Sequence, residues 1–349
     1  MKARSVVVAK FGTVDVLQTR EFELPDPEEN QITIAVHYAG INFADIIARR
    51  GYYEHAGQPP FTPGFEVSGR VAKAGKKSGY RENDSVLAVT RFGGYSNLVN
   101  VSHDRTFKLR AKENLKSAAA LPAVYLTSLH SLQHGLHFSR GESILIHSVA
   151  GGIGIAASQL CRNQGLEIFG TASSRDKLEF ASQHGLHHGI DSSHEDFVER
   201  VQEITNNSGI DLLLDSLGGT ALVKSLGLLK PMGRAVTIGG AGILPPDGHL
   251  LLQPIGAIKS ASEYIRARVH PLDLISRNIS LAGVQLLLLW DHLDHLRGLM
   301  SQILKEWRAG KLAPHIHATY PLENAGTAHT SIESRTTRGK LLLSTEFAD

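Results

Sequence analysis

The sequence predicts an α/β protein in which a β-rich domain is joined to a domain built on a doubly wound parallel sheet. The chain has 349 residues, more than one hydrophobic core usually holds. Its N-terminal third carries short runs rich in β-branched residues, without long helical patterns between them. Further along, apolar strand-like runs alternate with amphipathic helical segments, which is typical of a parallel sheet covered by helices.

The β-rich segments fall at both ends of the chain. In the N-terminal part, Gly, Pro or Asp residues bound each short run, so we expect an antiparallel, barrel-like arrangement. Near the C-terminus, a helical pattern over residues 291–309 ends at Gly310, and two strand-like segments follow it. The expected strands cover residues 5–9, 31–39, 66–71, 85–89, 314–322 and 338–343.

The segment between the two β-rich parts contains a glycine-rich turn. An apolar run over residues 143–146 leads into Gly152-x-Gly154-x-x-Ala157, and a second strand is expected at residues 166–171. In such a turn the first glycine allows a sharp bend, the second lets a pyrophosphate approach the backbone, and the small third residue lets the helix pack against the strand. The turn therefore predicts a dinucleotide site at the helix N-terminus, with an ordinary α/β crossover as the less favoured alternative.

Strands and helices continue to alternate after this turn. The last strand should form an edge of the sheet, and because apolar edges are usually covered by pairing, we expect a homodimer. Strands are expected over residues 189–191, 211–215, 234–239 and 279–284, and helices over residues 176–184, 195–205 and 221–229.

Composition and charge exclude several classes of protein. A formal net charge of +2 gives no reason to expect nucleic acid or an anionic membrane surface as a partner. The single Cys161 excludes an intrachain disulfide and indicates a reducing compartment. Residues 1–10 lack the apolar core of a secretory signal, and residues 281–290 are too few to span a bilayer. From these features we expect a cytoplasmic protein. The 18 histidines lack metal-ligand spacing, so we also expect no metal site.

Four motifs follow one another in a fixed order along the chain: Ala118-Ala119-Ala120-Leu121-Pro122, residues 147–154, Asp215-Ser216-Leu217-Gly218-Gly219 and Arg338-Gly339-Lys340-Leu341. In this order they resemble the motifs of the medium-chain dehydrogenase/reductase superfamily. Within it, the chain most resembles the zinc-independent quinone oxidoreductase branch, including its vesicle amine transport protein-like members, to which residues 228–234 and 310–316 are similar. This resemblance implies a GroES-like catalytic domain at residues 1–122 and 287–349 and a Rossmann NADPH-binding domain at residues 123–286.

The resemblance bears directly on the metal. Zinc-dependent members carry a Cys where this chain has Asn42 and a His where it has Phe65. Because a catalytic zinc would lose its usual thiolate and imidazole ligands there, the resemblance implies a zinc-independent protein. Glu66 remains beside Phe65, and we expect a structural role for it.

The loop after the second strand of the parallel sheet indicates NADPH as the cofactor. NAD sites usually place a carboxylate there, whereas this loop offers hydroxyls and cations that suit a phosphate. A solvated helix start is the alternative for Lys177, and His130 could equally be a packing residue. The resemblance implies cofactor contacts at Thr127, His130, Ala150, Gly151, Gly152, Ile153, Gly154, Ser173, Ser174, Lys177, Ser192 (a Tyr in many relatives), Gly239, Gly240, Ala282, Gly283, Val284 and Arg335.

Asn42 and Tyr53 match polar positions of the catalytic cleft in similar enzymes, and Ile47 replaces a tyrosine there. The resemblance therefore implies hydride transfer to a quinone or an α,β-unsaturated carbonyl, which needs mainly orientation and hydrogen bonds. A half-buried barrel aromatic is the alternative for Tyr53. A second hypothesis is an NADPH-binding regulatory or adaptor protein with little turnover.

Overall fold

The computed structural model describes residues 1–242 and 267–348. The chain divides into two compact units, which are treated separately here. The first unit comprises Met1–Leu126, Leu286–Lys305 and Ala313–Asp349, and the second comprises Thr127–Gln285 and Glu306–Leu312.

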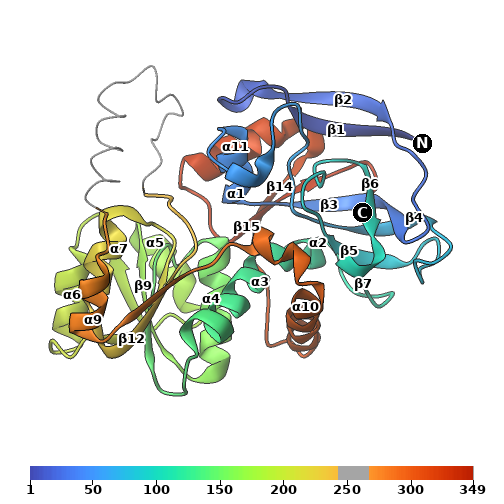
Figure 1. Ribbon diagram of the computed structural model, residues 1–349. Helices are drawn as coiled ribbons and strands as arrows, with labels where there is room; N and C mark the ends of the chain where they lie inside the picture. Colours follow the sequence, from blue (N-terminus) through green and yellow to red (C-terminus); the bar gives the residue numbers. More distant parts are fainter. Residues whose placement is uncertain (243–266, 349) are drawn as a thin grey trace. The chain divides into compact units, whose positions relative to one another are not determined.

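The first unit is organised around a seven-stranded sheet. The strands follow the order β14-β15-β3-β4-β5-β7, and β6 pairs with β3; only the β14–β15 pair is parallel. The strands expected near both ends of the chain are therefore present (Figure 1). Their bounds are β3 Gln31–Ile41, β4 Glu66–Ala74, β5 Ser85–Val89, β6 Leu98–Ser102, β7 Thr106–Lys108, β14 Ile316–Pro321 and β15 Lys340–Ser344.

The core of this unit lies against β3. Ile32, Ile34 and Val36 alternate along that strand and are fully buried, and most residues between and after them are buried too, so both faces of β3 are covered. The C-terminal strand β15 runs antiparallel beside the second half of β3, with Leu341 opposite Ile41. The remaining elements are the two-stranded sheet of β1 (Lys2–Val8) and β2 (Leu17–Glu23) and the helices α1 (Phe43–Arg49), α2 (Leu115–Ala119), α11 (Ala325–Glu333) and most of α10 (Leu293–Arg308).

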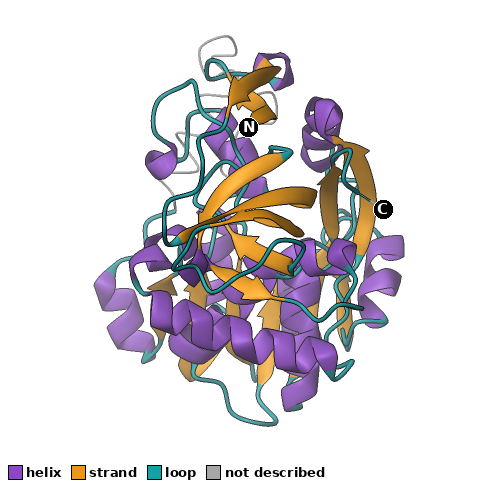
Figure 2. Ribbon diagram, turned by 90° about the vertical axis from the view of Figure 1, so that its right-hand side faces the viewer, coloured by secondary structure: helices purple, strands orange, loops and turns teal. Residues whose placement is uncertain are grey.

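The second unit is a doubly wound sheet of six parallel strands. The strand order β10-β9-β8-β11-β12-β13 is that of a dinucleotide-binding Rossmann fold. Helices α6, α7 and α9 run along one side of the sheet and α4 along the other (Figure 1), and Figure 2 shows the strands and helices in a second view. The strands are β8 Ser143–Ile146, β9 Glu167–Ala172, β10 His188–Asp191, β11 Ile210–Asp215, β12 Leu229–Thr237 and β13 Ser280–Gly283.

Local sequence determines where the helices of this unit begin and end. Asp196 caps α6 by accepting from the backbone N–H of Val198, and Gly165 ends α4 with a φ of +75°. Strand β13 lies at an edge of the sheet, as expected from its position in the sequence. The helices are α3 Pro122–His130, continued by a π-helical segment over Ser131–Leu136, α4 Gly152–Gln164, α5 Arg175–Ser182, α6 Phe197–Ile204, α7 Gly219–Leu226 and α9 Pro271–Arg277.

Within the described ranges, none of the helices combines the length and the apolar character needed to cross a membrane.

Candidate nucleotide-binding and catalytic residues

The glycine-rich turn joins β8 to α4 as the sequence predicts. Gly151 is the N-cap of α4, and the helix begins at Gly152. At Gly154 an added Cβ would lie 2.5 Å from the carbonyl oxygen of Ser148 and closer still to that of Val149, so only glycine fits. Ala150 and Ala157 are buried on either side of the turn. The first turn of α4 therefore presents unpaired backbone N–H groups at a close-packed bend, the geometry that holds a pyrophosphate.

His147, the residue between β8 and this turn, has a structural task. Its side chain is buried, with Nδ1 2.9 Å from Thr171 Oγ1 and Nε2 2.8 Å from Ser225 Oγ. Burial lowers the pKa of His147 to about 4, so the ring is neutral near neutral pH. His147 therefore links β8 to β9 and α7 beneath the turn, a role that sequence reasoning did not assign to it.

The hydroxyls predicted to bind a 2′-phosphate gather where β9 and β10 end. Lys177 Nζ donates to Ser173 Oγ at 3.1 Å, and Ser174 is the N-cap of α5 without a hydrogen bond from its own side chain to the helix. From the neighbouring strand, Ser192 Oγ donates to the carbonyl oxygen of Ala172 at 3.0 Å. The structure thus brings together an ammonium and three hydroxyls at the carboxyl ends of the neighbouring strands β9 and β10.

One carboxylate lies nearby, at the end of β10. Asp191 accepts from Ser193 N at 3.1 Å and pairs with His194 Nδ1 at 3.0 Å. The hydrogen bond with His194 holds the pKa of Asp191 below its usual value. Its side chain is 5% exposed, so this carboxylate serves the turn after β10.

Asp215 at the end of β11 shapes the next two loops. It is fully buried and accepts from Leu217 N, Gly218 N and Thr237 Oγ1 at 2.8–3.2 Å. Burial raises the pKa of this carboxyl despite these bonds. The loop it holds bonds in turn to the glycine loop after β12, because Ala241 N donates to Ser216 O at 3.2 Å. Gly239 and Gly240 lie in that glycine loop.

The other residues predicted in this unit lie at or near the carboxyl ends of the parallel strands. Ala282 and Gly283 end β13, and Val284 N donates to the carbonyl oxygen of Thr237 at 3.0 Å. Thr127 is buried in α3, and its neighbour Ser128 donates to the carbonyl oxygen of Ile153 at 3.3 Å. The His130 ring stacks on His134 with their centroids 5.0 Å apart.

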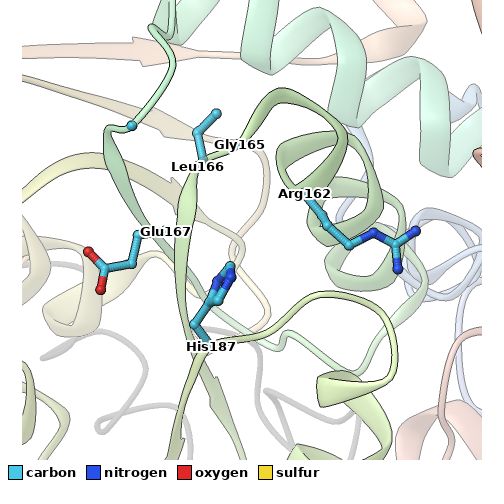
Figure 3. A pocket seen from close by; sticks show the side chains of 6 residues that line it. Arg162, Gly165, Leu166, Glu167 and His187 are labelled. Atoms are coloured by element: carbon cyan, nitrogen blue, oxygen red, sulfur yellow. The ribbon is translucent and has the colours of Figure 1, made fainter.

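A shallow pocket of about 260 Å³ lies at the opposite end of the strands, where β9 and β10 begin (Figure 3). Glu167 is the first residue of β9, His187 precedes β10, and Arg162 and Gly165 lie at the end of α4. Ligands of doubly wound sheets bind at the carboxyl ends of the strands, so this pocket is not the dinucleotide site.

In the first unit, Asn42 lies between two buried charged residues. Its Nδ2 donates to Glu66 Oε1 at 2.9 Å, and its Oδ1 accepts from Lys340 Nζ at 2.5 Å. Lys340 also forms an ion pair with Glu66, and these side chains are only 3% and 0% exposed. The other oxygen of Glu66 accepts from Ala123 N at 2.7 Å. Sequence reasoning gave Glu66 a structural role and missed Lys340.

A second group of buried polar residues lies behind Asn42. Asp45 accepts from Asn42 N and Gly64 N, both at 2.8 Å, and hydrogen-bonds with the Tyr95 side chain. Tyr95 OH lies 3.0 Å from His329 Nε2. Burial raises the pKa of Asp45 to about 7.

This group ends at a buried guanidinium. Arg49, 1% exposed, lies 3.1 Å from His329 Nδ1 and donates to Glu333 Oε1 at 2.6 Å. Burial lowers the pKa of His329 to about 3, with Arg49 adding to the effect.

Tyr53 belongs to a cluster of aromatic residues. Its ring centroid lies 6.0 Å from that of Phe65, and Phe65 lies 5.2 Å from Phe92. Because Phe65 directly precedes Glu66, Tyr53 and Asn42 both contact the start of β4. The two predicted catalytic residues thus contact consecutive residues of the chain, Tyr53 at Phe65 and Asn42 at Glu66. Arg335, also in this unit, lies exposed on the loop after α11 with a φ of +55°.

Comparisons with known proteins identify the family. A family model described as alcohol dehydrogenase GroES-like domain matches residues 28–111, and one described as zinc-binding dehydrogenase matches residues 152–286. The synaptic vesicle membrane protein VAT-1 homolog of Danio rerio is 35% identical over 98% of this chain and 70% of its own length. The quinone oxidoreductase of Sus scrofa is 30% identical over 97% of each chain. The chain belongs to the medium-chain dehydrogenase/reductase superfamily, in its quinone oxidoreductase branch.

Solved structures agree with this family. The crystal structure of Escherichia coli quinone oxidoreductase complexed with NADPH has a TM-score of 0.86 and 27% identity, covering 98% of this chain and 99% of that one. The expected GroES-like domain and Rossmann sheet of the superfamily are thus confirmed.

Proposed function

We propose that this protein is an NADPH-dependent oxidoreductase that transfers hydride to a quinone or an α,β-unsaturated carbonyl. The observation that carries the proposal is the cluster of Lys177, Ser173, Ser174 and Ser192 at the carboxyl ends of β9 and β10. A lysine and the hydroxyls of Ser173 and Ser174 can bind a phosphomonoester by charge-assisted hydrogen bonds, whereas the Ser192 hydroxyl already donates to the carbonyl oxygen of Ala172. A carboxylate here could have bound the ribose hydroxyls of NADH, but that of Asp191 is hydrogen-bonded to Ser193 N and His194 Nδ1.

The turn at Gly154 fits the remainder of the dinucleotide. Its backbone leaves no room for a Cβ, and the first turn of α4 directs N–H groups outward, as a pyrophosphate requires. The loops held by Asp215 lie at the carboxyl ends of the strands, as do the predicted nicotinamide neighbours Ala282, Gly283 and Val284. When bound, NADPH would supply the hydride, and the protein would supply binding and orientation.

The residues of the first unit favour an activated acceptor. Asn42 offers an amide N–H, and Tyr53 stands in an aromatic cluster suited to a flat, apolar ring. A quinone or enone needs little more than alignment and a hydrogen bond to its oxygen. The relatives named quinone oxidoreductase support the same substrate class. With Asn42 and Phe65 in place of the zinc ligands of other members, we propose that no zinc takes part.

A kinetic panel tests the proposal. NADPH oxidation is measured with quinones and enones in wild type, Asn42→Ala and Tyr53→Phe. Each variant should lower kcat/KM for a good quinone by about tenfold, which is about 1.4 kcal/mol of lost orientation. Both acceptors take up a proton, but enones must gain theirs as the hydride arrives, so they should lose more in Tyr53→Phe. A thousandfold loss of quinone turnover in Tyr53→Phe, with NADPH affinity intact, would show an obligatory proton donor in its place.

The alternative is an NADPH-binding regulatory or adaptor protein. It is favoured by the relatives named synaptic vesicle membrane protein VAT-1 homolog, which include a relative 35% identical to this chain. NADPH binding by calorimetry without turnover of any acceptor in the panel would support this alternative. Steady turnover would exclude it.

A further inference from the structure

The carboxamide of Asn42 is held between two charges of opposite sign. Lys340 Nζ donates to Oδ1 at 2.5 Å, and Nδ2 donates to Glu66 Oε1 at 2.9 Å. An ammonium can only donate a hydrogen bond, and an ionised carboxylate can only accept one. A flipped amide would place its NH₂ against the ammonium and its oxygen against the carboxylate. Only one orientation of the Asn42 amide therefore satisfies both neighbours.

Glu66 and Lys340 are themselves fixed. Glu66 Oε2 accepts from Ala123 N at 2.7 Å, and the carboxyl group lies over Gly40, where an added Cβ would approach Glu66 Cδ to 2.6 Å. Lys340 begins β15, and the next residue, Leu341, pairs with Ile41 of β3. The two charged side chains are held by β15 and β4, the two strands that flank β3, so they cannot follow a rotation of the amide. We call Lys340 and Glu66 the amide clamp.

The clamp leaves one hydrogen of Nδ2 unused among the described residues, and Asn42 is only half-buried. The side chain therefore offers an N–H, while its carbonyl oxygen is occupied. The cation that donates to this oxygen polarises the amide, and the carboxylate that accepts from Nδ2 fixes the direction of the remaining N–H.

We propose that Lys340 and Glu66 are positioning residues that fix Asn42 as a polarised hydrogen-bond donor to the carbonyl oxygen of the acceptor. Reduction adds hydride to a carbon of the acceptor and leaves negative charge on this oxygen, which later takes a proton from solvent. Asn42 stabilises the charge without giving up a proton. The clamp thereby selects acceptors with a conjugated carbonyl, an inference that rests on the proposed function.

The test removes the clamp without leaving a buried charge. Lys340→Met alone would strand Glu66, so the main variant combines Lys340→Met with Glu66→Gln, whose single amide oxygen can accept from either Asn42 Nδ2 or Ala123 N and which carries no charge. Lys340→Arg is the conservative variant. Lys108→Met with Asp84→Asn, which removes an ion pair at the surface of the same sheet, is the matched control.

Kinetics give the first readout. The main variant should lower kcat for a quinone about tenfold, like Asn42→Ala, while KM for NADPH stays unchanged. Combined with Asn42→Ala, it should lower kcat by no more than about twofold further, since both changes remove the same hydrogen bond. Lys340→Arg should keep most of the wild-type kcat, and the control variant all of it. The proposal fails if the main variant keeps the wild-type kcat. It also fails if the loss of kcat in the combined variant equals the product of the two separate losses.

Side-chain NMR gives a readout that does not depend on turnover. The ¹⁵N-bound NH₂ signals of Asn42, assigned by their absence in Asn42→Ala, should shift and exchange faster with solvent in the main variant but not in the control. Unchanged Asn42 signals would overturn the clamp. A wild-type protein that reduces no acceptor would instead remove the proposed function, and the NMR comparison would still decide whether Lys340 and Glu66 hold the amide.

Discussion

The buried carboxyl of Asp45 should make the stability of the first unit depend on pH. Burial raises its pKa from 3.8 to about 7, so the folded protein holds this proton at pH values where the unfolded chain has lost it. The protonated group therefore contributes stability that is complete below pH 3.8 and is lost as the pH rises through 7. Replacing Asp45 by Asn, which does not titrate, should abolish this dependence.

The size of the effect follows from the two pKa values. Between about pH 5 and pH 8, proton linkage with these values predicts a loss of about 2.5 kcal/mol in the free energy of unfolding. Asp45 also accepts from two backbone N–H groups, of Asn42 and Gly64, and an amide oxygen with one NH₂ cannot serve both as well. Asp45→Asn should therefore be less stable at low pH, with a flatter dependence on pH.

Tryptophan fluorescence provides the assay. Trp290 is buried in the first unit and Trp307 lies in the second, so a Trp307→Phe background reports on the first unit alone. Urea titrations give the free energy of unfolding at each pH, with and without Asp45→Asn. Asp26→Asn is the control: its exposed carboxylate has a pKa lowered by the hydrogen bond with Lys73, so its contribution is lost as the pH falls. Parallel pH curves for the background and Asp45→Asn would refute the reasoning.

Four further predictions concern the cofactor, the turn, the metal and the assembly. Lys177→Glu should weaken NADPH binding relative to NADH by about one to two orders of magnitude in calorimetry, whereas Lys224→Glu, the same charge change on α7, should not; equal affinities in wild type would contradict the assignment. Gly154→Ala should cost about 1–3 kcal/mol in urea titrations and weaken NADPH binding, because the added Cβ meets backbone oxygens. Purified protein should hold no stoichiometric zinc by elemental analysis and keep its turnover in chelators, because Asn42 and Phe65 are not zinc ligands. Light scattering should show a dimer formed through the edge strand Ser280–Gly283, and a monomer at micromolar concentration would count against it.

The parallel sheet was predictable because its strands are short apolar runs separated by amphipathic helices. Each strand expected between residues 143 and 284 is present, within a few residues at each end except that β12 begins five residues early, at Leu229. The first unit was harder. Strand β2 was missed because Leu17–Glu23 is largely exposed and lacks an apolar alternation, and its register is set by pairing with β1. Helix α1 was missed because Phe43–Arg49 follows the long strand β3 after a single residue.

The polar interior of the first unit could not be read from the sequence. Asn42, Glu66 and Lys340 lie far apart in the chain, and the pairing of β4 and of β15 with β3 brings them together. A weak signal existed, since Lys340 opens an otherwise apolar strand of three leucines. A charged residue at the start of such a strand is expected at the surface, and nothing in the local sequence indicates that Lys340 forms an ion pair with Glu66.

The pairing of β15 with β3 also has a consequence for synthesis of the protein. Ile41 is synthesised 300 residues before its partner Leu341. At roughly 5 to 20 residues per second, the second half of β3 waits about 15 to 60 s for its neighbour. During that time an apolar strand edge is open and Glu66 lacks its lysine. A nascent chain stalled before Lys340 should therefore be a preferred target for chaperones that recognise unpaired strands, and synthesis and release of β15 from the ribosome should end that binding.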